Sequence, residues 1–268
     1  MAVTLAGGCR VSHMHDGQPL IAGTLRVWPQ IGRATGAQAI SLSVLECATG
    51  LSPTMRNYDC DQILYLLNRD SGSGSNDTDD VNSNSDNLRV TIVIDCQSVK
   101  VEADTGIYIR PNQTFSIHNP DSGAVTMISS QCPDPDRPQQ FVNVPQLSPS
   151  LGPIPVVRLA DQKAQPTADR WYRVLIDERV GSTQVTQFVG SIPPGRAPDH
   201  FHDYEEVLFI LKGEGRMWAG QTNAPIGVGS CIYLPKGQLH CVENTGEGEL
   251  RLLGVFYPAG SPSVRYEA

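Results

Sequence analysis

Short apolar runs fill most of the chain, and glycine or proline interrupts them about every ten residues. No long stretch repeats its apolar residues with the 3.6-residue period of an amphipathic helix, so few helices are expected. Many short strands at this spacing predict an all-β protein of sandwich or barrel type. The runs expected as strands are Leu88–Asp95, Val99–Ala103, Gly106–Arg110, Gln184–Ile192, Glu206–Leu211, Cys231–Leu234 and Leu250–Tyr257.

Two segments break this pattern. Asp70–Asn87 contains almost no large apolar residue, which predicts a solvated loop between two strands, and its acidic residues lack the spacing of a calcium-binding EF-hand. Pro133–Pro153 is rich in proline and poor in apolar anchors, as interdomain connections are. We therefore expect a first domain over residues 1–132, a linker over 133–153 and a second domain over 154–268.

The two halves resemble each other. Residues 57–67 align with residues 201–211 at an offset of 144, and both segments place acidic residues before an apolar run. Residues 107–111 align with residues 231–235 at an offset of 124. The difference between the offsets falls where the first half carries its polar loop. An internal duplication with one inserted loop explains this pattern.

Composition excludes several classes of protein. The 268 residues are 40% hydrophobic, which is enough for real cores, and 28 acidic against 20 basic residues give a net charge of −8. Without a basic stripe, we expect no nucleic-acid partner. Apolar runs of strand length predict no membrane span, and the N-terminus lacks signal-peptide features, so a cytoplasmic protein is expected. The seven scattered cysteines contain no CxxC pair and are expected to be reduced.

Four side chains in the second half have the chemistry of metal ligands. His200 and His202 lie two residues apart and so share one face of a strand, and Glu206 has the same parity. His240 follows a Pro-x-Gly turn at the start of another strand, from which it could face the other three across a barrel. Three imidazoles and one carboxylate suit a divalent first-row metal and leave positions open for substrate or oxygen.

These residues stand in two blocks that resemble the signature motifs of the cupin family. The first block reads His200-x-His202, three residues, Glu206, six residues, Gly213; the second reads Gly229, five residues, Pro-x-Gly, two residues, His240, three residues, Asn244. Together with the duplication, the chain is similar to a bicupin over nearly its whole length. The resemblance implies two double-stranded β-helix (jelly-roll) barrels in tandem and a metal held by His200, His202, Glu206 and His240.

Neighbouring residues have expected roles as well. Tyr204 shares the parity of Glu206, so it lies either at the pocket mouth, as a hydrogen-bond donor or acid, or on the surface. Leu208 and Ile210 follow Glu206 on the inward face and are expected to make the pocket apolar. Glu205 has the opposite parity and is expected to face solvent.

The first half departs from the motif at every ligand. At the aligned positions it has Arg56, Tyr58, Gln62 and Ser116. Arginine only donates hydrogen bonds and repels a cation, so this barrel is expected to be free of metal. It serves either as a structural partner of the second barrel or, through Arg56 and Tyr58, as an anion-binding pocket.

Three functions remain open on this basis. The first is a metal-dependent oxidoreductase of dioxygenase type that acts on a small oxygenated or carboxylate-bearing metabolite, with Glu206 tuning the metal. The second is a redox-neutral isomerase, decarboxylase (lyase) or hydrolase, which needs its own acid or base, and only Tyr204 offers one. The third is a binding protein without turnover.

The expected cofactor is one divalent transition metal per chain. Fe2+ or Mn2+ is favoured, and Ni2+, Co2+, Cu2+ and Zn2+ suit the same donor set. The expected partner is a small-molecule substrate. A homodimer formed by strand exchange through Gly23–Ile31 is a further hypothesis.

Overall fold

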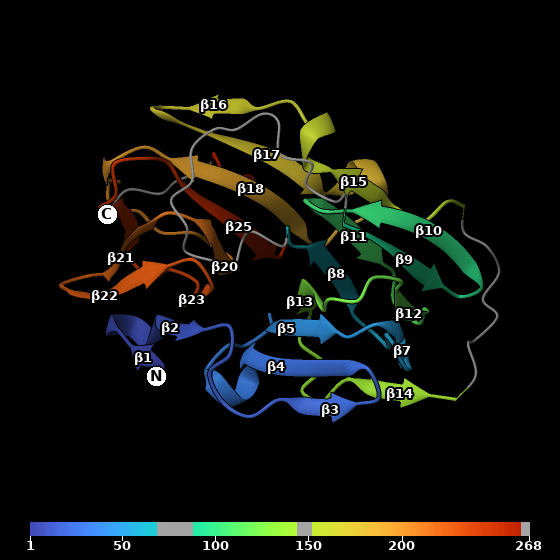
Figure 1. The fold of residues 1–268 in the computed structure, drawn as a ribbon. Coiled ribbons are helices and arrows are strands. Elements are labelled where there is room, and N and C mark those ends of the chain that lie inside the picture. The colour runs from blue at the N-terminus through green and yellow to red at the C-terminus, as the bar shows by residue number, and fades with distance from the viewer. Residues whose placement is uncertain (69–87, 144–151, 264–268) are drawn as a thin grey trace.

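The computed structural model describes residues 1–68, 88–143 and 152–263, and in these ranges it is built almost entirely of β-strands (Figure 1). The helical segments there are 3-10 turns of three residues: Ala6–Gly8, Arg33–Thr35, Leu159–Asp161 and Glu178–Val180. The predicted all-β class with few helices is confirmed. The polar loop expected at Asp70–Asn87 lies outside the described residues.

The second half is a sandwich of two antiparallel sheets. The larger sheet has eight strands in the order β1-β2-β23-β20-β25-β18-β17-β16, and the smaller has four in the order β19-β24-β21-β22. Their bounds are β1 Val3–Thr4, β2 Arg10–His13, β16 Gln165–Thr167, β17 Arg170–Ile176, β18 Thr186–Ile192, β19 Gly195–Arg196, β20 Glu205–Lys212, β21 Glu214–Ala219, β22 Thr222–Gly227, β23 Ser230–Leu234, β24 His240–Asn244 and β25 Leu250–Tyr257.

The first half repeats this arrangement. A seven-stranded sheet runs β15-β11-β8-β13-β5-β4-β3, and a six-stranded sheet runs β10-β9-β12-β7-β14 with β6 paired to β12. Their bounds are β3 Leu20–Ala22, β4 Leu25–Ile31, β5 Leu42–Cys47, β6 Gly50–Leu51, β7 Thr54–Arg56, β8 Asp61–Leu66, β9 Arg89–Ile94, β10 Gln97–Glu102, β11 Thr105–Ile109, β12 Thr114–Asn119, β13 Val125–Cys132, β14 Gln140–Val142 and β15 Val156–Arg158.

The halves exchange strands. β2 pairs with β23 of the second half, so the N-terminal strands lie beside the C-terminal barrel (Figure 1). In return, β15 pairs with β11 of the first half. β14, inside the segment expected as a linker, pairs with β7. The sheets therefore cross the boundaries expected at residues 132 and 154, because strand addition at sheet edges does not follow the compositional breaks.

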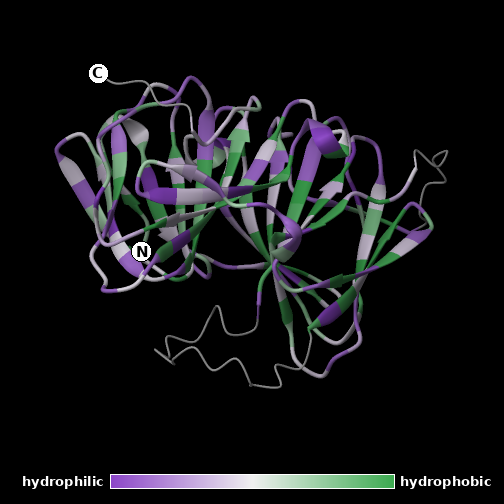
Figure 2. Cartoon of the chain, turned by 90° about the horizontal axis from the view of Figure 1, so that it is seen from above, coloured by the Kyte–Doolittle hydropathy of each residue, from purple (hydrophilic) through white to green (hydrophobic). Residues whose placement is uncertain are grey.

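Three apolar clusters hold the molecule together, and Figure 2 shows hydrophobic residues concentrated along the strands of both halves. One cluster fills the interior of each barrel. The third, which includes Tyr65, Phe209 and Leu253, joins the two halves through the outward faces of their larger sheets. Because inward and outward faces are both apolar, β20 carries seven consecutive buried residues rather than an alternating pattern.

The exchanged N-terminal strand should contribute to stability. Val11 on β2 is 7% exposed and packs in the core of the C-terminal barrel, whereas Val3 is 45% exposed. We expect Val11→Ala to lower the free energy of unfolding by about 1–3 kcal/mol through lost burial and a residual cavity. Val3→Ala should leave it almost unchanged in the same chemical denaturation. Equal effects of the two substitutions would contradict this packing.

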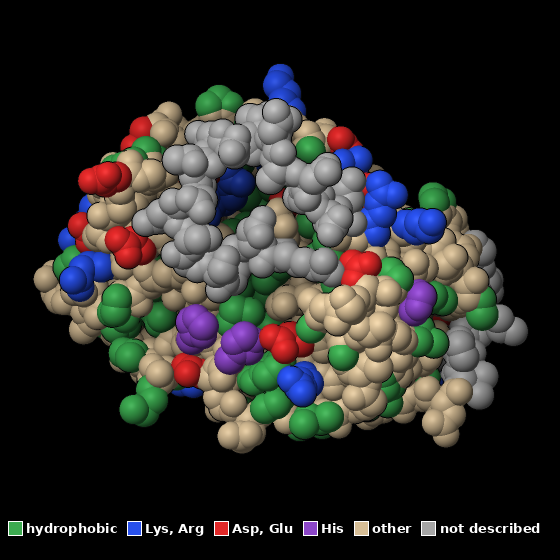
Figure 3. Space-filling view, in the orientation of Figure 1, with side chains coloured by type: hydrophobic (Ala, Val, Ile, Leu, Met, Phe, Trp, Pro, Cys, Tyr) green, Lys and Arg blue, Asp and Glu red, His purple; other side chains and the backbone are tan. Residues whose placement is uncertain are grey.

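The surface carries both acidic and basic side chains, as the composition of the chain indicates (Figure 3). On the face shown in Figure 3, Lys and Arg side chains are scattered among neutral and acidic ones. Within the described residues, no helix has the length and apolar character needed to cross a membrane.

Candidate metal centre

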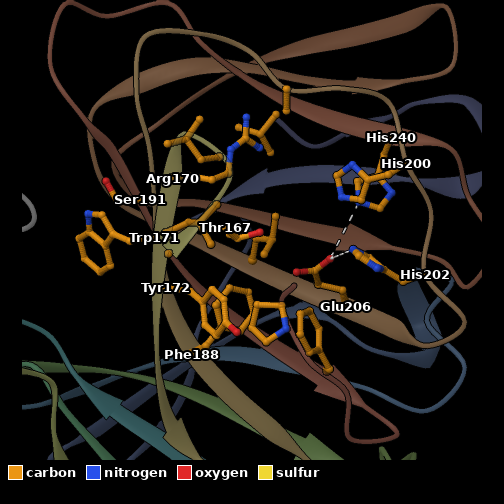
Figure 4. Close-up of a pocket in the computed structure, with 18 residues that line it drawn as sticks. Thr167, Arg170, Trp171, Tyr172, Phe188, Ser191, His200, His202, Glu206 and His240 are labelled. Carbon is orange, nitrogen blue, oxygen red and sulfur yellow. Dashed lines mark ion pairs between the residues drawn. The ribbon is translucent and has the colours of Figure 1, made fainter. Parts of the chain in front are cut away.

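Three histidines converge at one end of the C-terminal barrel. His200 and His202 stand in the segment that leads into β20, and His240 begins β24. An antiparallel bridge joins the backbones of His200 and His240, with N–H···O distances of 3.0 and 2.9 Å. One nitrogen from each of the three rings lies within 4.8 Å of the others (Figure 4). The structure thus brings the predicted imidazoles together from both motifs.

Backbone carbonyls orient two of these rings. His200 Nδ1 lies 3.0 Å from the Pro198 carbonyl oxygen, and His240 Nδ1 lies 2.7 Å from that of Gln238. A carbonyl only accepts, so Nδ1 carries the proton in each ring and Nε2 keeps its lone pair. This arrangement is typical of histidines that bind a metal through Nε2.

Glu206 completes the cluster. Its Oε2 lies 3.7 Å from His202 Nε2 and 4.0 Å from His240 Nε2 (Figure 4). The carboxyl group is 5% exposed. Three imidazole nitrogens and a buried carboxylate oxygen around one point fit a divalent transition metal.

Burial shifts the pKa values of Glu206 and His240 in the directions that favour their neutral forms. It raises the pKa of Glu206 to about 8 and lowers that of His240 to about 4, with His200 adding to the second shift. A cation at this position would reverse the preference of Glu206, because it stabilises the carboxylate. Metal affinity should therefore decrease as Glu206 becomes protonated.

The metal-free protein should lose stability between about pH 6.5 and pH 8. The pKa of Glu206 rises from 4.5 to about 8 on folding, so the stability it contributes is present at low pH and is lost as pH rises through 8. The lowered pKa of His240 acts oppositely, but only between about 4 and 6.5. Urea denaturation of chelator-treated protein measures this slope. Glu206→Gln should flatten it, and an unchanged slope in that variant would contradict the assignment.

The histidines and Glu206 line a small pocket of about 90 Å³. Leu208, Val242 and Leu252 contribute apolar walls, and the rings of Phe188 and Phe256 lie 4.8 Å apart beside them, tilted by 36°. Polar groups come from the β16–β17 hairpin, where Thr167 and Arg170 also line the pocket (Figure 4).

Tyr204 lies behind the cluster. Its ring stacks on that of His202 at 4.7 Å with an interplanar angle of 10°, and its hydroxyl donates to the Ser261 carbonyl oxygen at 3.3 Å. Tyr204 is 7% exposed, and Leu208 is on the pocket wall. Ile210 is fully buried in the barrel core, beyond the residues that line the pocket.

The expectation that Glu205 faces solvent is wrong. Glu205 is 6% exposed and accepts hydrogen bonds from the backbone N–H of Gln38 at 2.8 Å and of Ala39 at 2.6 Å, and from the Tyr233 hydroxyl. The outward face of β20 is covered by the first half, so opposite parity does not mean exposure. Glu205 thereby links the two halves next to a predicted metal ligand.

The structure also gives a different alignment between the two halves from the one predicted. The pairs Tyr108–Asp61 and Tyr233–Glu205 occupy equivalent places, and so do Asn119 and Asn244, each of which donates to two carbonyl groups. Asp61 and Glu205 are 144 residues apart, as in the predicted alignment. Tyr108 and Tyr233, and likewise Asn119 and Asn244, are 125 residues apart instead of the predicted 124. A slip of one residue in a strand turns a side chain to the other face of the sheet.

The corrected register replaces two of the four aligned residues. His200 pairs with His240 as Met55 pairs with Phe115, so Met55 and Phe115, not Arg56 and Ser116, hold the equivalent positions. Gln62 remains equivalent to Glu206. Met55 and Phe115 are at most 1% exposed inside their barrel.

Arg56 and Tyr58 make a surface stack instead. The Arg56 guanidinium lies 4.7 Å from the centre of the Tyr58 ring, Arg137 lies 4.2 Å from it, and the Tyr58 hydroxyl donates to Gln140. Ser116 is buried on the face opposite Phe115.

Sequence reasoning missed Arg170 and Thr167, because no local pattern marks a hairpin thirty residues before the first histidine as part of the site. For Glu205 a signal existed, since both halves carry an acidic residue at this place in the duplication.

Comparisons with known proteins agree with this geometry. The family model for the cupin domain matches residues 188–256, which include all four predicted ligands. An uncharacterized protein of Aquifex aeolicus is 31% identical over 108 residues, which are 35% of this chain and 88% of that protein. The oxalate-binding protein of Thermotoga maritima is 36% identical over 66 residues, 24% of this chain and 54% of its own length.

Auxin-binding protein 1 of Arabidopsis thaliana is 32% identical over 83 residues, so the matching part of the chain spans 27% of this protein and less than half (42%) of that relative. Two solved structures match nearly the whole fold. A mutant of Bacillus subtilis oxalate decarboxylase has a TM-score of 0.68 at 13% identity, covering 92% of this chain and 76% of its own. A protein described as glyoxylate-induced from Pseudomonas aeruginosa has a TM-score of 0.71 at 14% identity, covering 97% and 93%. The chain, with two such barrels and the metal motif in the second, belongs to the cupin superfamily as a bicupin.

Proposed function

We propose that the chain is a metal-dependent enzyme that acts on a small carboxylate-bearing substrate in the C-terminal barrel. The observation that carries this proposal is a pocket of about 90 Å³. Its lining includes the candidate ligands His200, His202, His240 and Glu206 and also Arg170. A cation and an arginine around so small a volume suit an anionic molecule of few atoms.

His200, His202, His240 and Glu206 would hold the metal, and Fe2+ or Mn2+ is the favoured ion. When bound, a divalent metal supplies a Lewis acid for the oxygen atoms of the substrate. The fixed Nδ1–H tautomers of His200 and His240 keep both Nε2 atoms available for this role.

Arg170 is proposed to anchor the carboxylate. Its Nε donates to Asp169 Oδ1 at 3.0 Å, which leaves the terminal nitrogens for a substrate. A guanidinium and a carboxylate form paired, charge-assisted hydrogen bonds. The apolar walls at Leu208, Val242 and Leu252 lower the polarity around the bound carboxylate, which strengthens these contacts.

Cleavage of a carbon–carbon bond beside the carboxylate, as in a decarboxylase, is the reaction that the pocket supports best. Its small volume of about 90 Å³ favours a substrate of few atoms over flavonols or hydroxylated aromatic acids, the larger dioxygenase substrates. The printed name of the Thermotoga relative, an oxalate-binding protein, supports a small carboxylate as ligand. A dioxygenase remains the second candidate, because the apolar walls would equally suit O2 chemistry.

The test is turnover of oxalate, glyoxylate, malonate and acetoacetate by the metal-loaded protein, with release of CO2 and consumption of O2 recorded together. Arg170→Gln should raise KM about 10- to 100-fold, as loss of a charged hydrogen bond does. Arg216→Gln is the matched control, since Arg216 bonds Asn223 at the surface.

Each outcome separates the candidates. Release of CO2 without net consumption of O2 supports a decarboxylase and rejects a dioxygenase, whereas consumption of one O2 per turnover does the reverse. An unchanged KM in Arg170→Gln would remove the proposed anchor.

A further inference from the structure

The N-terminal barrel contains a cavity of about 330 Å³, larger than the pocket beside the histidines. It lies between the inner face of the seven-stranded sheet and residues 134–139. Val27, Leu45 and Pro29 form an apolar side. The rest of the lining is rich in hydroxyl and amide groups, including those of Ser41, Ser43, Ser129, Gln131 and Gln139.

The cavity arises at the positions where the other barrel is filled by aromatic rings. In the N-terminal barrel, Met127 pairs with Leu45 on one side and Leu66 on the other. In the C-terminal barrel, Leu252 pairs in the same way with Gly190 and Ile210. This register makes Ser43 equivalent to Phe188 and Gln131 equivalent to Phe256. The two phenylalanine rings lie 4.8 Å apart and fill part of the C-terminal barrel, whereas the smaller serine and the glutamine line a cavity in the N-terminal barrel.

At the positions of two predicted metal ligands, the N-terminal barrel has apolar residues in place of histidines. Met55 and Phe115 stand where the second barrel has His200 and His240, so no imidazole pair is available there. The cavity is open to solvent on one side, since Pro29, Arg33 and Arg137 of its lining are exposed, so its polar groups are accessible to a ligand.

Gln62, the equivalent of Glu206, lies behind the cavity lining and holds two of its polar side chains in place. Its side chain is fully buried, and its Nε2 donates to Ser129 Oγ at 3.0 Å and lies 3.4 Å from Gln139 Oε1. Both partners line the cavity. Gln62 Oε1 is buried without a hydrogen-bond partner among the described residues. A buried acceptor of this kind destabilises the fold unless a donor reaches it.

The charges around the cavity balance each other. Asp134 Oδ2 accepts from the Arg33 backbone N–H at 2.9 Å, and the Arg33 guanidinium donates to the Asp134 carbonyl oxygen. Arg137 is committed to the ring of Tyr58 and lies 4.0 Å from Asp59. Apart from these groups and the exposed Asp136, the lining consists of neutral donors and acceptors beside an apolar wall.

We propose that the N-terminal barrel binds an uncharged polyhydroxylated molecule of monosaccharide size, without a metal. Its hydroxyl groups would exchange hydrogen bonds with Ser43, Ser129 and Gln131, which line the cavity. Its carbon framework would lie against Val27 and Leu45. The volume is within the range of about 300–1,000 Å³ that is typical of small-molecule sites.

The experiment is isothermal titration calorimetry with D-glucose, D-ribose, myo-inositol and glycerol, and with oxalate and phosphate as anionic probes. Metal-free His240→Ala protein is used beside wild type, so that the C-terminal site does not contribute. At least one polyol should bind both proteins equally. Calorimetry is preferred because sugars at high concentration stabilise proteins without specific binding.

Variants locate the site. Ser43→Phe, which introduces the aromatic ring found at the equivalent position of the other barrel, should abolish binding. Ser129→Ala, a smaller change that serves if Ser43→Phe fails to fold, should weaken it about two- to tenfold. Ser98→Ala, on the exposed part of β10, should have no effect.

Absence of binding by all four polyols would overturn the proposal, and so would binding that survives in Ser43→Phe and Ser129→Ala. Binding of oxalate or phosphate at this site in place of the polyols would overturn the ligand class. None of these results depends on metal or turnover, so they leave the proposed function of the C-terminal barrel to its own test.

Discussion

His240→Ala is expected to abolish metal binding. The substitution removes an Nε2 ligand whose ring is held by Gln238 and which lies opposite His200 and His202. Loss of an outer-shell partner of a ligand already costs about 10- to 100-fold in metal affinity, so loss of the ligand itself should exceed 100-fold. Equilibrium dialysis with Mn2+ and the rise in Tm on adding Mn2+ both report this loss, because a metal bound only by the folded state stabilises it.

His118→Ala is the matched control, because His118 is an exposed histidine on β12 of the other barrel. It should bind Mn2+ as wild type does. If His240→Ala kept full affinity for the ion, or if His118→Ala lost it, the assigned ligand set would be wrong.

Glu205→Ala is expected to give the largest loss of stability among the single substitutions considered. It leaves the backbone N–H groups of Gln38 and Ala39 and the Tyr233 hydroxyl without their buried acceptor. Each unsatisfied buried group costs about 1–3 kcal/mol, so the free energy of unfolding should decrease by about 3 kcal/mol or more. Because the same carboxylate joins the two halves, chemical denaturation should also show a less cooperative transition.

Glu247→Ala provides the comparison, since Glu247 is an exposed glutamate in the turn before β25. It should change the free energy of unfolding by less than about 0.5 kcal/mol. A similar small effect of Glu205→Ala would show that the contact between the halves does not depend on this carboxylate.

The elements and the candidate ligands could be predicted because their signals are local. The apolar run 250–257 became β25 with the same bounds, and Glu206–Leu211 lies within β20. His200, His202 and Glu206 lie within seven residues and His240 follows a Pro-x-Gly turn, so two short motifs in the sequence mark the four candidate ligands.

Features that depend on distant segments could not be predicted in this way. The cover over Glu205 comes from residues 38 and 39, and Arg170 reaches the site from a hairpin that packs on it only in the folded sheet. Register in the first half needed the pairing of β7 with β12, because apolar residues such as Met55 and Phe115 leave no motif. The alignment of the two halves at offsets of 144 and 124 then selected the wrong neighbour of each.

Anomalous diffraction from crystals of the purified protein, recorded at the absorption edge of the metal found in it, addresses the central assignment directly. We expect one strong peak per chain, bonded to the Nε2 atoms of His200, His202 and His240 and to the carboxylate of Glu206, and no peak between Met55 and Phe115. A peak at the N-terminal barrel, or none at the three histidines after soaking in Mn2+ or Fe2+, would contradict this assignment.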